Sequence, residues 1–128
     1  MGLDMYLFRR LRNKHPNSPK DKEAAYWRKA NQIHQWFVKN VQDGVDDCEI
    51  HNEVTRDVLE ELLDTCRIVA EDPSRAEELL PSQSGFFFGS TAYDEGYFLD
   101  ITDTIEILER VIEETNFETE MIYYLSWW

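Results

Sequence analysis

The two ends of the chain carry the alternating apolar pattern of β-strands, whereas most of the segments between them carry the period of helices. In residues 3–9, Leu3, Met5 and Leu7 lie on one face of the predicted strand. Residues 121–128 are apolar on both faces, which favours a central position in a sheet. A chain of this kind must pack helices against a sheet to bury its apolar faces.

Residues 22–41 predict a helix, because apolar side chains recur there every three or four positions. We expect Asp21 to cap the start of this helix and Gly44 to mark its end. The apolar stripe consists of Tyr26, Ala30, Ile33, Phe37 and Val41.

Shorter patterns place the remaining elements. They are expected at 49–54 (a strand), 55–70 (a helix with Thr55 as N-cap), 73–80 (a short helix), 85–89 (a short strand or an aromatic-rich turn) and 101–114 (a helix). The proline-rich residues 15–20 are expected to form an exposed loop. The sequence therefore predicts a single α+β domain over residues 1–128, with a small, mainly antiparallel sheet covered by about three main helices.

The charge of the chain is large and unevenly distributed. The 128 residues include 13 Lys and Arg and 26 Asp and Glu, which gives a formal net charge of −13. Residues 1–42 hold nine of the cations and three of the acids, so residues 43–128 hold four cations and 23 acids. A net charge of this sign repels phosphate, and we expect no direct binding to nucleic acid or to anionic lipid.

The expected cellular compartment depends on two features that this sequence does not contain. No apolar run approaches the roughly 20 residues of a membrane span, and the N-terminus carries no signal core. We therefore expect a cytoplasmic protein with no membrane association. Cys48 and Cys66 are too few for a disulfide framework, and Cys66 falls on the buried stripe of the 55–70 helix.

One candidate site would bind a flat, polar-edged ligand such as a nucleotide. Residues 82–94 combine glycines, hydroxyls and aromatic rings, which suit stacking and hydrogen bonding to a base. The 22–41 helix adds a second row of aromatic and polarisable side chains. The candidate ligand-binding residues are Trp27, His34, Trp36, Gln83, Ser84, Phe87, Ser90 and Tyr93. The favoured alternative is a helix buried on two sides and a buried edge strand flanked by turns.

An enzymatic site is a further alternative. It would use His34 with Cys48, Asp46 and Asp47, but no recognised catalytic motif surrounds them, so no catalytic residue is assigned. The cysteines and histidines lack the paired spacing of a zinc site, and the acids at 43–49 do not match a calcium loop. We expect neither a metal nor another cofactor.

The acidic helix at 101–114 favours a different kind of site. Carboxylates recur there every three or four residues, which places neighbours roughly 5–6 Å apart, a distance comparable to the spacing of phosphates along a nucleic-acid strand. Such a surface can bind a basic channel of a nucleic-acid-binding protein. The candidate partner-binding residues are Asp103, Glu106, Glu109 and Glu113. The alternative is that these acids only confer solubility.

Several segments resemble a family of small, uncharacterised proteins encoded by bacteriophages and prophages. The resemblance covers nearly the whole chain and is carried by residues 1–7 (MGLDMYL), 25–31 with the following His34, Trp36 and Phe37, 44–48 and 81–90 (PSQSGFFFGS). It implies a phage accessory protein made inside a bacterial cell. Such proteins often antagonise host defences, for example by blocking a CRISPR or other nuclease or by sequestering a signalling nucleotide.

These observations lead to one expectation and leave two questions open. We expect a non-enzymatic protein that inhibits a host defence component by binding it through an acidic surface. Capture of a nucleotide-like ligand is the alternative. The sequence does not decide whether Trp127 and Trp128 pack into the chain's own core or against a second copy, so a homodimer stays open.

Overall fold

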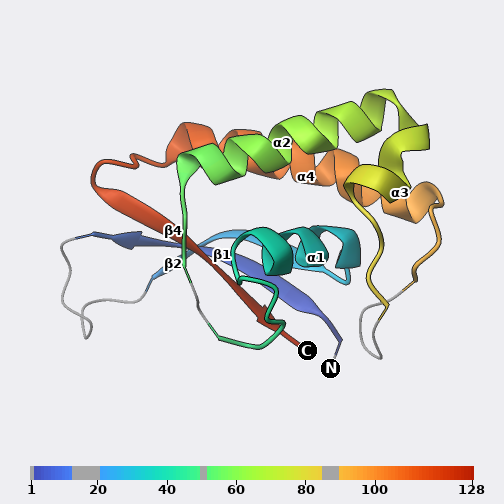
Figure 1. Cartoon of the computed structure of the whole chain (residues 1–128). Helices are drawn as coiled ribbons and strands as arrows, with labels where there is room; N and C mark the ends of the chain where they lie inside the picture. The colour runs from blue at the N-terminus through green and yellow to red at the C-terminus, as the bar shows by residue number, and fades with distance from the viewer. Residues whose placement is uncertain (1, 13–20, 50–51, 85–89) are drawn as a thin grey trace.

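The chain folds into an antiparallel sheet with helices packed on one of its faces, which confirms the predicted α+β class (Figure 1). The structure is a computed structural model and describes residues 2–12, 21–49, 52–84 and 90–128. The elements are β1 (Asp4–Leu11), β2 (Lys22–Arg28), α1 (Asn31–Asn40), β3 (Glu53–Val54), α2 (Arg56–Glu71), the 3-10 turn η1 (Pro73–Arg75), α3 (Ala76–Leu79), α4 (Glu95–Glu114) and β4 (Glu120–Trp127).

The sheet has the strand order β2-β1-β4-β3, and all of its described pairings are antiparallel. Strand β4 lies between β1 and β3, which confirms the central position predicted from its two apolar faces. Strand β3 has two residues and is shorter than the strand predicted at 49–54, of which residues 50–51 lie outside the described residues. The loop predicted at 15–20 and the strand or turn predicted at 85–89 also lie outside them.

The helix predicted at 22–41 is wrong in its first half. Residues 22–28 form β2, which pairs with β1, and helix α1 begins only at Asn31. Trp27 faces the core while Tyr26 is exposed, so the true period of this segment is two. Lys29, with φ of 56°, turns the chain between the two elements. The prediction was wrong because Ala30 lies four residues after Tyr26, which is a helical spacing. Ala30 immediately precedes α1, so the strand residue Tyr26 was counted as part of the helical stripe.

The predicted cap of that helix is wrong as well. Asp21 does not cap a helix; its carboxylate accepts two hydrogen bonds from Arg10 at 2.9 and 3.0 Å and one from the hydroxyl of Tyr123. The residue that precedes α1 is Ala30, which offers no side-chain hydrogen bond. The backbone of this region is fixed by strand pairing instead of by a capping side chain.

The later helices follow the sequence more closely. Thr55 caps α2 as predicted, with its hydroxyl accepting a hydrogen bond from the amide of Val58 at 3.4 Å. The short helix predicted at 73–80 corresponds to η1 and α3. Helix α4 starts at Glu95, before the predicted residue 101, because Asp94 caps it by accepting from the amide of Tyr97.

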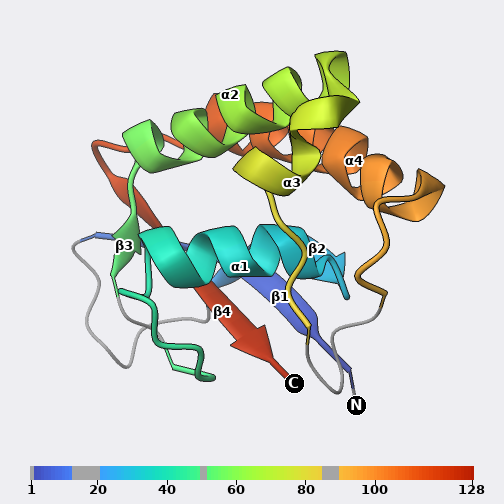
Figure 2. The ribbon, with the colours of Figure 1, turned by 45° about the vertical axis from the view of Figure 1, so that its right-hand side comes forward.

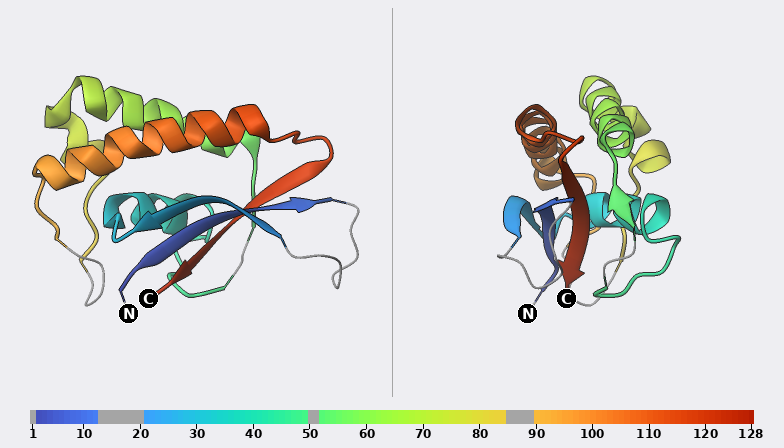
Figure 3. Two further views of the ribbon diagram at one scale, coloured as in Figure 1. Left: turned by 180° about the vertical axis from the view of Figure 1, so that it is seen from behind. Right: turned by 90° about the vertical axis from the view of Figure 1, so that its left-hand side faces the viewer.

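The core lies between the sheet and the helices. Met5 and Leu7 on one face of β1 are fully buried, as is Leu3 just before the strand, and this agrees with their predicted alternation. Helices α2 and α4 run side by side over this core, and α1 lies against the sheet (Figures 2 and 3). The ring of Phe37 on α1 stacks on Tyr124 of β4 with centroids 4.2 Å apart.

Candidate functional site

Helices α2 and α4 form the most acidic part of the molecule. Residues 55–115 contain 16 acids and four arginines. The predicted partner-binding residues Asp103, Glu106, Glu109 and Glu113 are all exposed on α4. Twelve of these acids lie on α2 and α4, which pack side by side.

The arginines of the N-terminal segment are engaged in the sheet. Arg10 pairs with Asp21 at 2.9 Å, and Arg12 pairs with Glu53 at 2.7 Å. Arg28 lies 3.7 Å from Asp4 on the neighbouring strand. These ion pairs hold the strands and their flanking turns together. None of these three printed pairs involves an acid of α4, on which Glu109 lies 3.3 Å from Arg67 of α2.

A groove of about 640 Å³ runs between α2 and the C-terminal half of α4. Glu109 and Glu113 line it, opposite Glu60 and Asp64 of α2. Arg67 also lines the groove and bridges the two helices through Glu109 at 3.3 Å. Asp103 and Glu106 lie outside the groove lining. Two of the four predicted partner-binding residues therefore share a groove with α2, and the other two lie nearer the N-terminus of α4.

Three of the predicted ligand-binding residues are buried in the core. Trp27 of β2 donates its indole N–H to the hydroxyl of Thr104 on α4 at 2.9 Å. Trp36 and His34 are 8% and 0% exposed on α1. The burial of these side chains matches the alternative in which α1 is covered on two sides, and ligand binding by them stays a prediction.

Asn31 holds Gln83 and Ser90 against the start of α1. The side-chain amide of Asn31 donates to the carbonyl of Ser90 at 2.8 Å, and its oxygen accepts from the amide of Gln83 at 2.9 Å. Of the other predicted ligand-binding residues, Ser84 and Tyr93 are exposed, and Phe87 lies outside the described residues.

Asn31 therefore joins Gln83 and Ser90 through its side chain, although the sequence did not single it out as a site residue. The one available signal was its position in the same helical row as Trp27 and His34. A second contact joins Ser82 to Tyr93, whose hydroxyl accepts a hydrogen bond from the amide of Ser82 at 3.1 Å.

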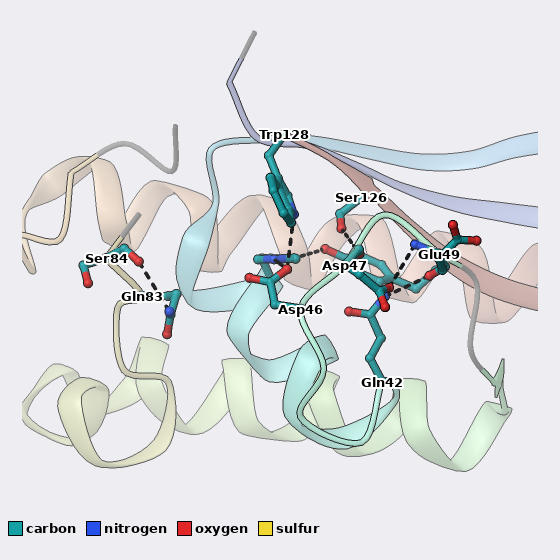
Figure 4. A network of polar contacts seen from close by, with 10 residues as sticks. Gln42, Asp46, Asp47, Glu49, Gln83, Ser84, Ser126 and Trp128 are labelled. Carbon is teal, nitrogen blue, oxygen red and sulfur yellow. Dashed lines mark hydrogen bonds and ion pairs between the residues drawn. The ribbon is translucent and has the colours of Figure 1, made fainter. Parts of the chain in front are cut away.

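The structure brings together two of the residues named for an enzymatic site. The Nε2 atom of His34 lies 2.9 Å from the carboxylate of Asp46. The indole N–H of Trp128 reaches the same oxygen at 3.2 Å (Figure 4). Burial lowers the pKa of His34, although Asp46 partly opposes this effect. A neutral imidazole that donates from Nε2 to Asp46 fits this environment.

The other two residues named for an enzymatic site make different contacts. Asp47 accepts a hydrogen bond from the amide of Glu49, and the hydroxyl of Ser126 reaches the carbonyl of Asp47 (Figure 4). Cys48 is a free, half-buried thiol. The contacts place His34 and Asp46 in one hydrogen-bonded group and leave the catalytic alternative a prediction.

No group of three or more His, Cys, Asp and Glu side chains in residues 2–12, 21–49, 52–84 and 90–128 could hold a metal ion. In the same part of the chain, no helix combines the length and the apolar character that crossing a membrane requires.

No protein family, curated protein or solved structure matches the chain.

Proposed function

We propose that this protein acts by binding, and that it presents the acidic surface of α2 and α4 to a positively charged surface of another protein. The observation that carries the proposal is the charge of two helices that pack side by side: α2 and α4 together carry 12 acids and three arginines. The exposed carboxylates of these two helices form the acidic surface.

The spacing of the carboxylates supports a partner that binds nucleic acid. Neighbouring acids on one helix face lie roughly 5–6 Å apart, so a row of them presents negative charge at intervals similar to those of phosphates. In Glu106, Glu109 and Glu113, α4 supplies such a row. A basic channel that normally holds a nucleic-acid strand would attract this row, and salt would weaken the attraction.

The groove between α2 and α4 supports a specific contact in addition to long-range attraction. It places Glu60 and Asp64 opposite Glu109 and Glu113, where Arg56 pairs with Glu60 at 2.9 Å and Arg67 lies 3.7 Å from Asp64 and 3.3 Å from Glu109. A guanidinium or ammonium group of the partner would compete with these arginines for carboxylates of both helices. Arg67 already bridges the helices through Glu109, which shows that an arginine fits between these carboxylates.

The biological setting that we propose comes from the resemblance to phage and prophage proteins. In that setting the protein is made in the cytoplasm of a bacterial cell, and its partner is a defence protein that binds nucleic acid, such as a nuclease. Inhibition then follows from occupation of the nucleic-acid channel and requires no bond-making by this chain.

The test is a charge-reversal variant with a matched control. Proteins retained by the immobilised wild-type protein from a bacterial lysate are eluted with double-stranded DNA, and the eluted protein is purified. Its affinity is then measured for wild type and for the triple variant Glu106→Lys, Glu109→Lys and Glu113→Lys. The control reverses the same number of exposed charges elsewhere, at Glu23, Glu49 and Glu118.

We expect the α4 variant to lose most of its affinity and the control variant to retain it. We also expect the wild-type affinity to fall as salt is added. Retained proteins that DNA does not release, or equal affinities of the two variants, would contradict the proposal.

A further inference from the structure

The face of the sheet that points away from the helices carries a patch of aromatic and apolar side chains. Strand pairing places Tyr6 of β1 beside Tyr26 of β2 and Leu125 of β4, and it places Trp127 of β4 in the adjoining row beside Asp4. The patch is defined as Tyr6, Tyr26, Leu125 and Trp127. In the view from behind, these three strands lie in front of α1 (Figure 3).

The patch combines exposed and half-buried side chains: Tyr26 and Trp127 are exposed, and Tyr6 and Leu125 are half-buried. The rings of Tyr6 and Tyr26 lie with centroids 5.3 Å apart, and Tyr6 stacks on Phe8 at 5.4 Å. Even so, Tyr26 is 42% exposed and Trp127 is 65% exposed. Large aromatic side chains gathered on a flat face are typical of protein interfaces, because burying them yields much apolar contact at little cost in conformational entropy.

The charges at the patch compensate each other. Asp4 lies 3.7 Å from Arg28 and accepts a hydrogen bond from the hydroxyl of Tyr26 at 2.6 Å. An acid and a base therefore sit side by side next to the aromatic rings. A surface that holds both signs of charge can meet a copy of itself across a twofold axis without opposing like charges.

The net charge of the chain favours self-association through the patch over self-association through the helices. Each chain carries a formal net charge of −13, and the acidic surface lies on the outer side of the helix pair. The core separates that surface from the patch. Two chains that meet through their patches keep the acidic surfaces on the outside, whereas contact through the helices would bring the carboxylates of both chains together.

We propose that the patch is the interface of a symmetric homodimer in which two sheets pack face to face. A nucleic-acid strand fits the patch less well, although aromatic rings on an open sheet can stack on bases. The charged neighbours Asp4 and Arg28 form an ion pair with no net positive charge, and the field of the whole chain repels phosphate. The proposal is independent of the acidic surface and its partner.

The test measures the dimer dissociation constant of the full chain by sedimentation equilibrium. The variants Trp127→Ser and Tyr26→Ser each remove one ring of the patch, on different strands, so that one remains informative if the other fails to fold. The matched control is Leu99→Ser, which removes a side chain of similar exposure, 59%, from α4. Circular dichroism checks that each variant keeps the fold.

We expect both patch variants to weaken the dimer about tenfold or more and the control to leave it unchanged. Added salt should strengthen the wild-type dimer, because it screens the repulsion between two acidic chains. The fluorescence of Trp127 should shift to shorter wavelength on association.

Three results would overturn the proposal. The first is a wild-type protein that stays monomeric at all concentrations. The second is a dimer that the patch variants do not affect. The third is a wild-type protein that binds a labelled single-stranded oligothymidylate, with the binding lost in Trp127→Ser, since the patch would then bind nucleic acid. None of these results bears on the acidic surface, whose complex is expected to weaken with salt.

Discussion

The hydroxyl of Tyr124 lies 2.6 Å from Nδ1 of His34, and this contact joins β4 to α1 across the core. Burial raises the pKa of Tyr124 well above its ordinary value, so the phenol keeps its proton and donates it to Nδ1. Asp46 accepts from the opposite ring nitrogen. Both nitrogens of the imidazole are thus used in holding the loop after α1 and the end of β4 in place.

The free energy of unfolding should fall as the pH is lowered below 6.5, the ordinary pKa of histidine, because of His34. The folded chain keeps this imidazole neutral while the unfolded chain protonates it, so the unfolded state binds more protons. The contribution is at most about 1.4 kcal/mol per pH unit. Urea titrations between pH 7 and pH 5 should show a smaller loss for His34→Gln than for wild type. Equal slopes would show that His34 titrates freely in the folded chain.

Asp100 should have the opposite dependence on pH. Burial raises its pKa from 3.8 to about 6, with smaller effects from Gln32, Asp103 and Asp94. The folded state therefore loses stability as the pH rises from 3.8 through 6, where the carboxyl must ionise inside the structure.

The variant Asp100→Asn removes that cost. We expect it to be more stable than wild type by about 1 kcal/mol at pH 8, after allowing for partial solvent access, and to match wild type below pH 4. Thermal denaturation at both pH values measures the difference. Glu106→Gln, an exposed change on the same helix, serves as the control and should show no comparable gain at pH 8.

Thr104 should be far more important to stability than Thr102 on the same helix. Thr104 is fully buried and accepts the indole N–H of Trp27 at 2.9 Å, whereas Thr102 is exposed. Thr104→Val leaves a buried donor without its acceptor and should cost about 1–3 kcal/mol. Thr102→Val should change the unfolding free energy by less than about 0.5 kcal/mol. Similar losses for both variants in urea denaturation would argue against the buried hydrogen bond.

The two cysteines should differ in reactivity. Cys66 is 0% exposed on α2, and burial raises its pKa to about 12, so the thiolate needed for alkylation is scarce at neutral pH. Cys48 is half-buried in the loop after α1. Mass spectrometry after iodoacetamide treatment should find Cys48 modified and Cys66 intact in the native protein, and both modified in urea. Early labelling of Cys66 would show that α2 opens locally.

The sequence located elements well where one period dominated. The apolar stripe of α2 and its N-cap Thr55 could be predicted for two reasons. The apolar side chains face one side of the helix, and the capping hydroxyl is next to the helix in the sequence. The candidate sites were harder to predict from the sequence. The acids of α4 could be recognised from their spacing, but the groove that Glu109 and Glu113 share with α2 depends on how two distant helices pack.

By itself, the sequence determined the α+β class, the first and last strands, helix α2 and the concentration of acids in the second part of the chain. These depend on side-chain period, local capping and composition. Only the tertiary structure decided that residues 22–28 form a strand, because the backbone of this segment is satisfied by pairing with β1 and its turn into α1 comes at Lys29. It also decided that Arg10 and Arg12 pair within the sheet, since their acids lie far away in the chain or across a loop and only folding brings the charges together.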